Sequence, residues 1–115
     1  MAELTAHDDP THTRVALKGR LDLPGVQGLE TQFAANTAAA KKPAVIDMSD
    51  VVFIASLGLR MLLSSAKALK AAGARMVILN PPAPVAEVLR TAGVDKVITV
   101  TNDEHMALAI ALSVV

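Results

Sequence analysis

The sequence has no cysteine, tryptophan or tyrosine, and aromatic residues make up only 2% of its 115 positions. Without cysteine, the chain forms no disulfide and has no thiol nucleophile or cysteine-ligated zinc or iron–sulfur site. With so few aromatic side chains, it lacks the stacking platforms on which single-stranded nucleic acids bind. Thiol chemistry and base stacking are therefore excluded, and we expect no cofactor.

An excess of charge of either sign is also missing, since 11 Lys and Arg residues balance 11 Asp and Glu residues. Nucleic-acid and membrane-surface binding both need a basic patch, so neither is expected. No apolar run approaches the ~20 residues of a membrane-spanning helix, and the acidic, polar N-terminus is unlike a signal peptide. Hydrophobic residues make up 52% of the chain, which indicates a folded protein. We expect a single cytoplasmic domain over residues 1–115.

The spacing of apolar residues predicts alternating strands and helices. Polar and apolar residues alternate over 13–19, as in a half-buried strand, and the leucine spacing after Ser56 predicts an amphipathic helix that ends near Gly73. Ser49 and Asp50 predict a turn between two short apolar runs. The strands are expected over 4–7, 13–19, 44–48, 75–79 and 97–100, and the helices over 24–41, from 56 to about 72, over 85–92 and after a cap at Thr101 or Asn102.

This order of elements predicts an α/β fold with a mixed sheet of four to five strands and about four covering helices. The first two strands are expected to form a hairpin, and the later ones to pair in parallel through right-handed crossovers. In such sheets, functional sites gather at the carboxyl ends of the parallel strands.

Two helix starts carry the candidate site residues. Asp22 is expected to be the N-cap of a helix with Pro24 in its first turn. Ser56 lies at or near the N-cap of the next helix. In one interpretation its hydroxyl only caps that helix. In the other it is phosphorylated, because the positive helix end and its free amides accommodate a phosphate.

The Gly-Arg-Leu-Asp segment over 19–22 and the run over 45–63, with Ser56 and Gly58 inside it, resemble a STAS domain, and more narrowly the bacterial anti-sigma factor antagonists. The resemblance covers nearly the whole chain in length and in order of elements. It implies a partner-switching protein whose unphosphorylated form binds a serine kinase of the histidine-kinase-like ATPase type that doubles as an anti-sigma factor. Phosphorylation releases this partner, and a serine phosphatase resets the switch; any ATP is expected on the kinase.

The resemblance also implies roles for single residues. Ser56 is the expected phosphoacceptor, and Asp22 matches an acidic position beside it. Gly58 matches a small residue that lets the partner approach the helix start, and Leu57 and Met61 are expected to form an exposed apolar patch. The expected partner-binding residues are Asp22, Ala55, Leu57, Gly58, Arg60 and Met61.

Two positions depart from the best-known version of the family, which has Asp just before the serine and often Ser or Thr just after it. Here these positions are Ala55 and Leu57, which weakens a sigma factor as the client more than it weakens the switch itself. The alternative is a STAS subunit that is not phosphorylated, such as the cytoplasmic partner of a lipid-transport ABC complex. A serine hydrolase is not expected, because the Gly-x-Ser-x-Gly elbow is missing, and the three histidines have no metal-ligand spacing. The oligomeric state is not predicted.

Overall fold

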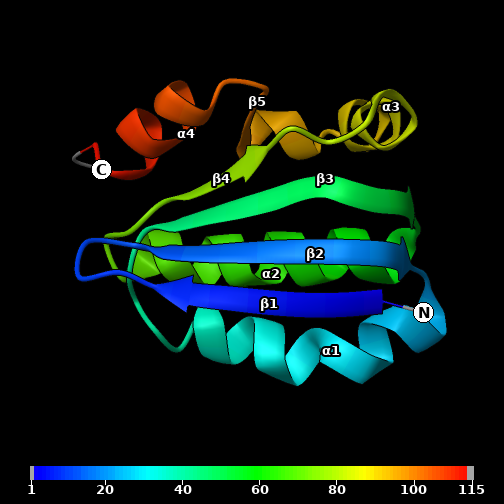
Figure 1. The fold of residues 1–115 in the computed structure, drawn as a ribbon, viewed down its shortest axis with the longest axis horizontal. Coiled ribbons are helices and arrows are strands. Elements are labelled where there is room, and N and C mark those ends of the chain that lie inside the picture. The colour runs from blue at the N-terminus through cyan, green and yellow to red at the C-terminus, as the bar shows by residue number, and fades with distance from the viewer. Residues whose placement is uncertain (1, 114–115) are drawn as a thin grey trace.

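The computed structural model describes residues 2–113, which form a five-stranded sheet with four α-helices (Figure 1). The strands are β1 (Ala2–Asp8), β2 (Thr13–Leu21), β3 (Ala44–Ile54), β4 (Met76–Leu79) and β5 (Thr99–Thr101). The helices are α1 (Leu23–Asn36), α2 (Ser56–Ala71), α3 (Ala83–Thr91) and α4 (Glu104–Ala111), with a short 3-10 helix, η1 (Val94–Lys96), after α3. The predicted α/β fold is confirmed.

The sheet is mixed, as expected. Its strand order is β1-β2-β3-β4-β5, so each strand lies beside the next one in the sequence. β1 and β2 form an antiparallel hairpin, whereas the β2–β3, β3–β4 and β4–β5 pairs are parallel. Parallel neighbours need a crossover connection, and α1, α2 and α3 supply the three crossovers.

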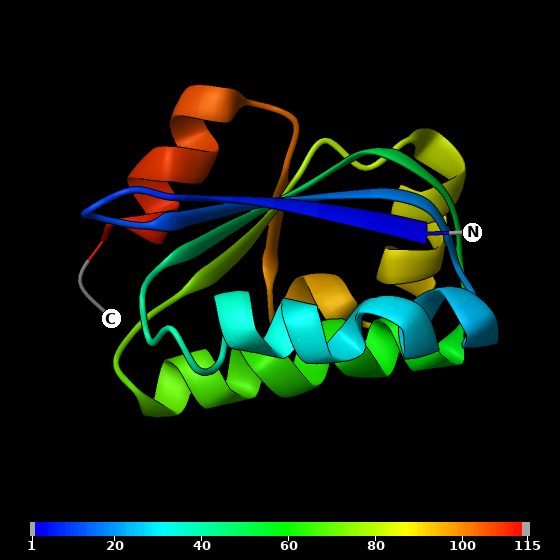
Figure 2. The same cartoon turned by 60° about the horizontal axis from the view of Figure 1, so that its bottom comes forward.

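Helices cover the two faces of the sheet unequally (Figure 2). α1 and α2 lie side by side against one face, and their apolar stripes bury most of the core. Its largest fully buried side chains include those of Leu17, Phe33, Leu62, Leu69 and Ile78. α4 lies on the opposite face, where a second and smaller cluster joins it to β3 and β4. This cluster consists of the buried Val45, Val77, Leu79, Ala107 and Ala111, with Ile110 packed against it.

An ion-pair cluster connects α4 to the sheet. Arg14 of β2 donates hydrogen bonds to Asp47 of β3 at 3.1 Å and to Glu104 of α4 at 2.9 Å. The hydrogen bond to Glu104, opposed by partial burial, raises the pKa of Arg14. Because the three side chains come from three elements, the cluster links the start of α4 to β2 and β3, beside its apolar contact with β3 and β4.

The predicted turn at Ser49 and Asp50 is wrong, because β3 runs unbroken through both residues. The Asp47 side chain accepts hydrogen bonds from the Ser49 amide, at 3.0 Å, and from the Ser49 hydroxyl. Burial would raise the pKa of Asp47, but these hydrogen bonds and the charge of Arg14 outweigh it and lower the pKa. The pairing register between β2 and β3 shifts close by, so the polar residues produce an irregular stretch of strand instead of a turn.

Two helix boundaries also differ from the prediction. α1 ends at Asn36, not near residue 41, because the buried Thr37 hydroxyl donates to the Phe33 carbonyl at 2.7 Å and the chain leaves the helix there. α4 is capped by Asp103, whose side chain accepts from the Met106 amide at 3.1 Å, not by Thr101 or Asn102. Gly73 ends the α2 segment with a φ of +80°, as predicted. Between residues 2 and 113, no helix is both long enough and apolar enough to cross a membrane.

Candidate functional site

The candidate site lies where the carboxyl ends of β2 and β3 meet the starts of α1 and α2. Leu21 and Ile54, the last residues of the two strands, are paired in the sheet. The next residue after β3, Ala55, donates its amide to the Leu21 carbonyl at 3.1 Å. This bond brings the starts of the two helices together at one end of the molecule.

Ser56 is the first residue of α2, and its side chain is exposed. The expectation that Ser56 caps the helix is wrong, because the N-cap is Ala55, which has no side-chain oxygen to accept from the first amides. No hydrogen bond among residues 2–113 engages the Ser56 hydroxyl, and no acidic residue lies in the first turn of α2. The hydroxyl therefore points to solvent beside helix amides that lack a side-chain acceptor.

Asp22 is the N-cap of α1, as predicted. Its carboxylate accepts from the Gly25 amide at 3.0 Å and from the Arg20 side chain at 3.2 Å. The Gly25 hydrogen bond lowers the pKa of Asp22, desolvation opposes it, and Arg20 adds to the lowering. The carboxylate is thus held in its charged form and has fixed partners in α1 and β2.

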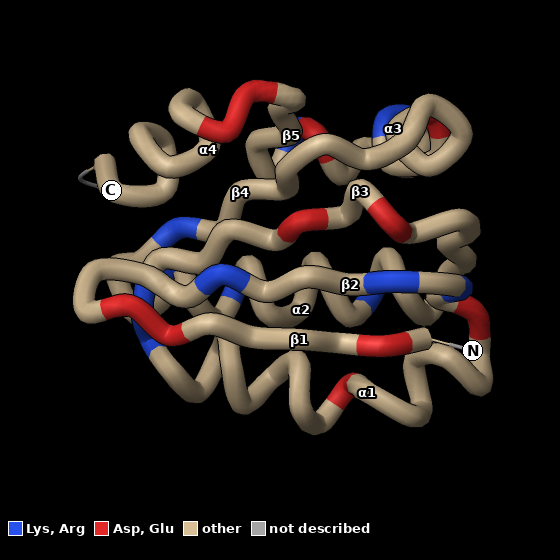
Figure 3. The backbone as a smooth tube through the Cα atoms, viewed as in Figure 1, with Lys and Arg blue, Asp and Glu red and all other residues tan. Residues whose placement is uncertain are grey.

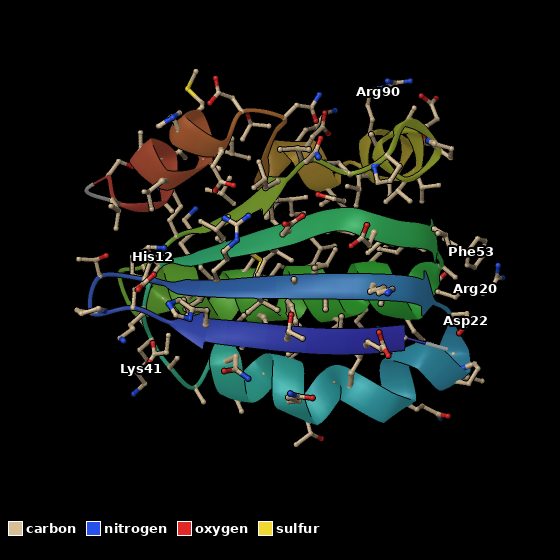
Figure 4. The ribbon with its side chains drawn as sticks, viewed as in Figure 1. His12, Arg20, Asp22, Lys41, Phe53 and Arg90 are labelled. Carbon is tan, nitrogen blue, oxygen red and sulfur yellow. The ribbon has the colours of Figure 1, made fainter. Side chains whose placement is uncertain are left out.

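Arg20 links Asp22 to an aromatic residue that the sequence reasoning did not select. Its guanidinium lies over the Phe53 ring, 4.3 Å from the ring centroid. Figure 4 shows Arg20, Asp22 and Phe53 together at one end of the molecule, at the carboxyl ends of β2 and β3. A cation over an aromatic face is a favourable contact, so it holds the Phe53 ring in place.

Exposed apolar side chains surround this end of the sheet. Leu23, Val52 and Phe53 are 52%, 66% and 39% exposed, respectively. Sequence reasoning missed all three, since Val52 and Phe53 belong to an apolar run that is typical of a buried strand. Val52 and Phe53 lie between the buried Val51 and Ile54, and their exposure becomes visible only in the folded chain. Exposed apolar residues gathered at one place are typical of a protein-binding surface.

Two of the expected partner-binding residues are buried. Met61 is only 7% exposed, so the prediction that it contributes to an exposed patch is wrong. It lines a groove of about 610 Å³ between α1 and α2, together with the half-buried Leu57 and the exposed Arg60. Gly58 faces β2 and β3, where an added Cβ would lie 2.8 Å from an Ile54 side-chain carbon. The absence of a side chain at Gly58 therefore allows α2 to pack closely against the sheet, and does not make room for a partner.

Charge at the candidate site is low and balanced. Figure 3 shows acidic residues on β1 and β3 and basic residues on β2, which lies between them. At the site, Arg20 and Asp22 neutralise each other in an ion pair. Across residues 2–113, no group of three or more His, Asp or Glu side chains is arranged to hold a metal ion. The site is a largely neutral surface with an apolar rim.

Comparison with known proteins identifies relatives of this fold. The family model described as "Mlab, STAS domain" matches residues 4–101. An anti-sigma factor antagonist from Mycobacterium paratuberculosis has a similar structure, with a TM-score of 0.85 and 23% identity over 98% of this chain and 96% of that one. The Bacillus cell fate determinant SpoIIAA in its phosphorylated form has a TM-score of 0.69 and 17% identity, over 94% and 98% of the two chains.

A part of a membrane protein is similar as well. The murine anion transporter Slc26a9 has a TM-score of 0.74 and 18% identity, and the match covers 91% of this chain but 18% of that one. No curated protein matches the sequence. At these identities the solved structures show a shared fold.

Proposed function

Because the chain belongs to the STAS domain family, we propose that it is a partner-switching regulator similar to the anti-sigma factor antagonists. In the proposed cycle, the unphosphorylated form binds a serine kinase of the histidine-kinase-like ATPase type that also acts as an anti-sigma factor. Phosphorylation of Ser56 releases this partner, and a serine phosphatase removes the phosphate. The chain itself is the substrate of these enzymes, not an enzyme, and we place the cycle in the cytoplasm.

The observation that carries this proposal is the exposed Ser56 hydroxyl at the start of α2, shortly after the exposed Val52 and Phe53 of β3. The hydroxyl has no internal hydrogen bond to lose when it becomes a nucleophile. In the transfer step, Ser56 Oγ forms a bond to the γ-phosphorus of ATP on the kinase, the bond from that phosphorus to the ADP oxygen breaks, and a base of the kinase takes the hydroxyl proton. ADP leaves, and a phosphoserine remains.

The surroundings of Ser56 explain how a phosphate would change binding. It adds about −1.5 to −2 charges at pH 7. The helix start accommodates this charge, because the first amides of α2 have no side-chain acceptor. A partner that covers Leu23, Val52 and Phe53 would have to desolvate the new charge, so phosphorylation weakens its binding.

The expected contact residues divide into two groups on this proposal. Asp22, Ala55, Leu57 and Arg60 are exposed or half-buried around Ser56 and would contact the partner directly. Gly58 and Met61 lie beneath that surface and support it. Arg20 and Phe53 join the contact surface through their cation–aromatic pair.

A second candidate function is that of a constitutive STAS subunit in a transporter, such as a lipid-transport ABC complex. Two observations favour it: the description of the matched family model and the similarity to a transporter STAS region. Ala55 and Leu57, which replace the Asp and the Ser or Thr of the best-known switching proteins, are compatible with it. In this case the same surface binds a partner, but Ser56 is not modified.

Phosphorylation in the source cell distinguishes the two functions. The wild-type chain, Ser56→Ala and Ser64→Ala are expressed in that cell, recovered and mapped for phosphate by mass spectrometry. Ser64 is an exposed serine on the same helix and serves as the matched control. We expect phosphate on Ser56 in the wild type and in Ser64→Ala, and its loss in Ser56→Ala.

Partner capture completes the test. Ser56→Ala is expected to retain a kinase-type partner and Ser56→Asp to lose it. No phosphate on Ser56, together with equal capture of a transporter subunit by both variants, would contradict the switch and support the second function.

A further inference from the structure

A small basic pocket lies at the end of α2 remote from Ser56. It has a volume of about 190 Å³ and is lined by residues of α2, the α2–β4 connection, β4 and the segment after η1. Three of these residues are cationic, and the others have apolar side chains. The lining residues are Ala66, Lys67, Lys70, Ala74, Arg75, Met76 and Val97.

Within the part of the chain that the structure describes, the three cations of this pocket have no acidic partner. Lys67, Lys70 and Arg75 take part in none of the ion pairs between residues 2 and 113, which use other Lys, Arg and His residues. No carboxylate lines the pocket. A chain with equal numbers of acidic and basic residues therefore concentrates three uncompensated positive charges around one cavity. Such a concentration of charge favours an anion.

The Arg75 side chain provides an independent observation. Its Nε atom is buried and has no hydrogen-bond partner within the described residues. A buried donor without an acceptor costs free energy, and native structures rarely contain one. An anion oxygen in the pocket would supply the missing acceptor. Arginine is well suited to this role, because its planar fork matches the oxygens of a phosphate.

We propose that this pocket binds a phosphate monoester whose organic group is small and apolar. The three positive charges of the two lysines and the arginine are enough to neutralise both negative charges of a phosphate monoester dianion. Met76 is buried at the pocket and Val97 is 57% exposed beside it, so an apolar group next to the phosphate gains contact with both. The volume equals roughly six water molecules at ~30 Å³ each, which limits the enclosed part of the ligand to a phosphate and a short group.

The pocket is separate from the candidate partner-binding site. With a rise of 1.5 Å per residue, Lys67 and Lys70 lie about 16 and 21 Å along α2 from Ser56. Ser56 is at the carboxyl end of β3, whereas Met76 is the first residue of β4. Figure 1 shows α2 running along the sheet between these two ends. The phosphate ester is thus a second ligand, whose binding does not depend on the state of Ser56.

Amide NMR titration of the full chain tests the proposal. Phenyl phosphate and inorganic phosphate are added at constant ionic strength, with sodium chloride as the reference salt. We expect saturable shifts confined to amides over 66–76 and at 97, with phenyl phosphate binding several-fold more tightly than phosphate. The double variant Lys67→Gln/Lys70→Gln should weaken binding at least tenfold. The matched variant Lys18→Gln/Lys41→Gln, at two positions outside the pocket, should bind as the wild type does.

Two further measurements keep the result decisive. Thermal unfolding of each variant without phosphate shows whether a loss of binding reflects a loss of folding. Arg75→Lys keeps the positive charge but removes the planar guanidinium, so it should weaken binding while the protein stays folded. Vesicles with phosphatidic acid, compared with phosphatidylcholine alone, distinguish a lipid headgroup from a soluble ester. Binding to these vesicles without binding of phenyl phosphate would contradict a ligand with a small organic group. Shifts that do not saturate, that spread over all lysines, or that persist in Lys67→Gln/Lys70→Gln would overturn the proposal.

Discussion

The contact between Gly58 and the sheet yields the sharpest prediction about the site. In Gly58→Ala, the new Cβ would lie 2.8 Å from Ile54 Cγ1 and 3.0 Å from both the Cβ and the carbonyl oxygen of Leu21. That carbonyl already accepts the Ala55 amide at 3.1 Å. The strand cannot move away from the new methyl group without stretching this hydrogen bond, which also holds the residue before Ser56.

Two opposing contributions determine the size of the effect. Overpacking of a well-filled core costs about 1–3 kcal/mol. Alanine is a better helix former than glycine by up to about 1 kcal/mol, which offsets part of that cost. Gly58→Ala should therefore lower the free energy of unfolding by up to about 2 kcal/mol. For a chain of this size, 1 kcal/mol corresponds to roughly 4 °C in Tm.

Gly28→Ala is the matched control. Gly28 is exposed within α1, and an added Cβ there would meet nothing within 4 Å. Only the helix-forming contribution applies, so Gly28→Ala should raise the free energy of unfolding by about 0.5–1 kcal/mol. The two variants have the same chemical change in a helix and are expected to shift stability in opposite directions.

Circular dichroism in thermal and urea unfolding measures both variants, since the chain has no tryptophan or tyrosine for fluorescence. If Gly58→Ala is stabilised as much as Gly28→Ala, the close approach of α2 to β2 and β3 is refuted. If Gly58→Ala is destabilised and partner capture also falls, the same contact positions the binding surface.

The remaining predictions concern other parts of the fold. Gly25→Ala should destabilise more than Gly58→Ala in the same assay, because its Cβ would lie 2.0 Å from the backbone oxygen of Arg20. Ser56→Asp should raise the free energy of unfolding by about 0.3–1 kcal/mol, since a carboxylate in the first turn of α2 favours the helix, and a lower Tm would contradict this. The pKa of Asp47 is lowered in the folded state, so its ionised form stabilises the fold above the unfolded pKa of about 4, and this stabilisation is lost as the pH falls through the folded pKa. Asp47→Asn should be less stable at pH 7, and its Tm should fall less steeply between pH 5 and pH 2 than that of the wild type; parallel pH profiles would refute the role of the carboxylate.

The order and types of the elements were predictable, because apolar spacing and turn residues determine them locally. Asp22 with Pro24 specified the start of α1, and Gly73 the end of α2. The turn at Ser49 and Asp50 was predicted from their residue types alone. In the structure the Asp47 side chain accepts a hydrogen bond from the Ser49 amide, and the segment remains a strand. That hydrogen bond involves neighbours two residues apart, but a sequence pattern does not show which local bond forms.

The place of the candidate site at the carboxyl ends of β2 and β3 was predictable from the sequence, but the exposure of its side chains was not. The motif and the predicted helix start both selected Ser56, but the N-cap of α2 is the residue before it, Ala55. Met61 and Phe53 were misjudged in opposite directions. Met61 lies on the side of α2 that faces α1, where it is buried. Phe53, near the end of β3, is partly exposed under the Arg20 guanidinium. Both outcomes depend on contacts between distant segments, which periodicity alone does not supply.

The free energy of local opening is expected to differ between the two faces of the sheet, because the apolar cluster under α4 is small. Among residues 2–113, the small cluster joins this eight-residue helix to the sheet through Ala107, Ala111 and Ile110, assisted by the Arg14–Glu104 ion pair. Alanine buries little area, so α4 is expected to separate from the sheet at a lower free energy than α1 and α2. The larger core lies on the other face and stays closed when this happens. Amide exchange should therefore divide the molecule into a slowly exchanging unit, formed by the central strands with the interiors of α1 and α2, and a C-terminal helix that opens without disturbing it.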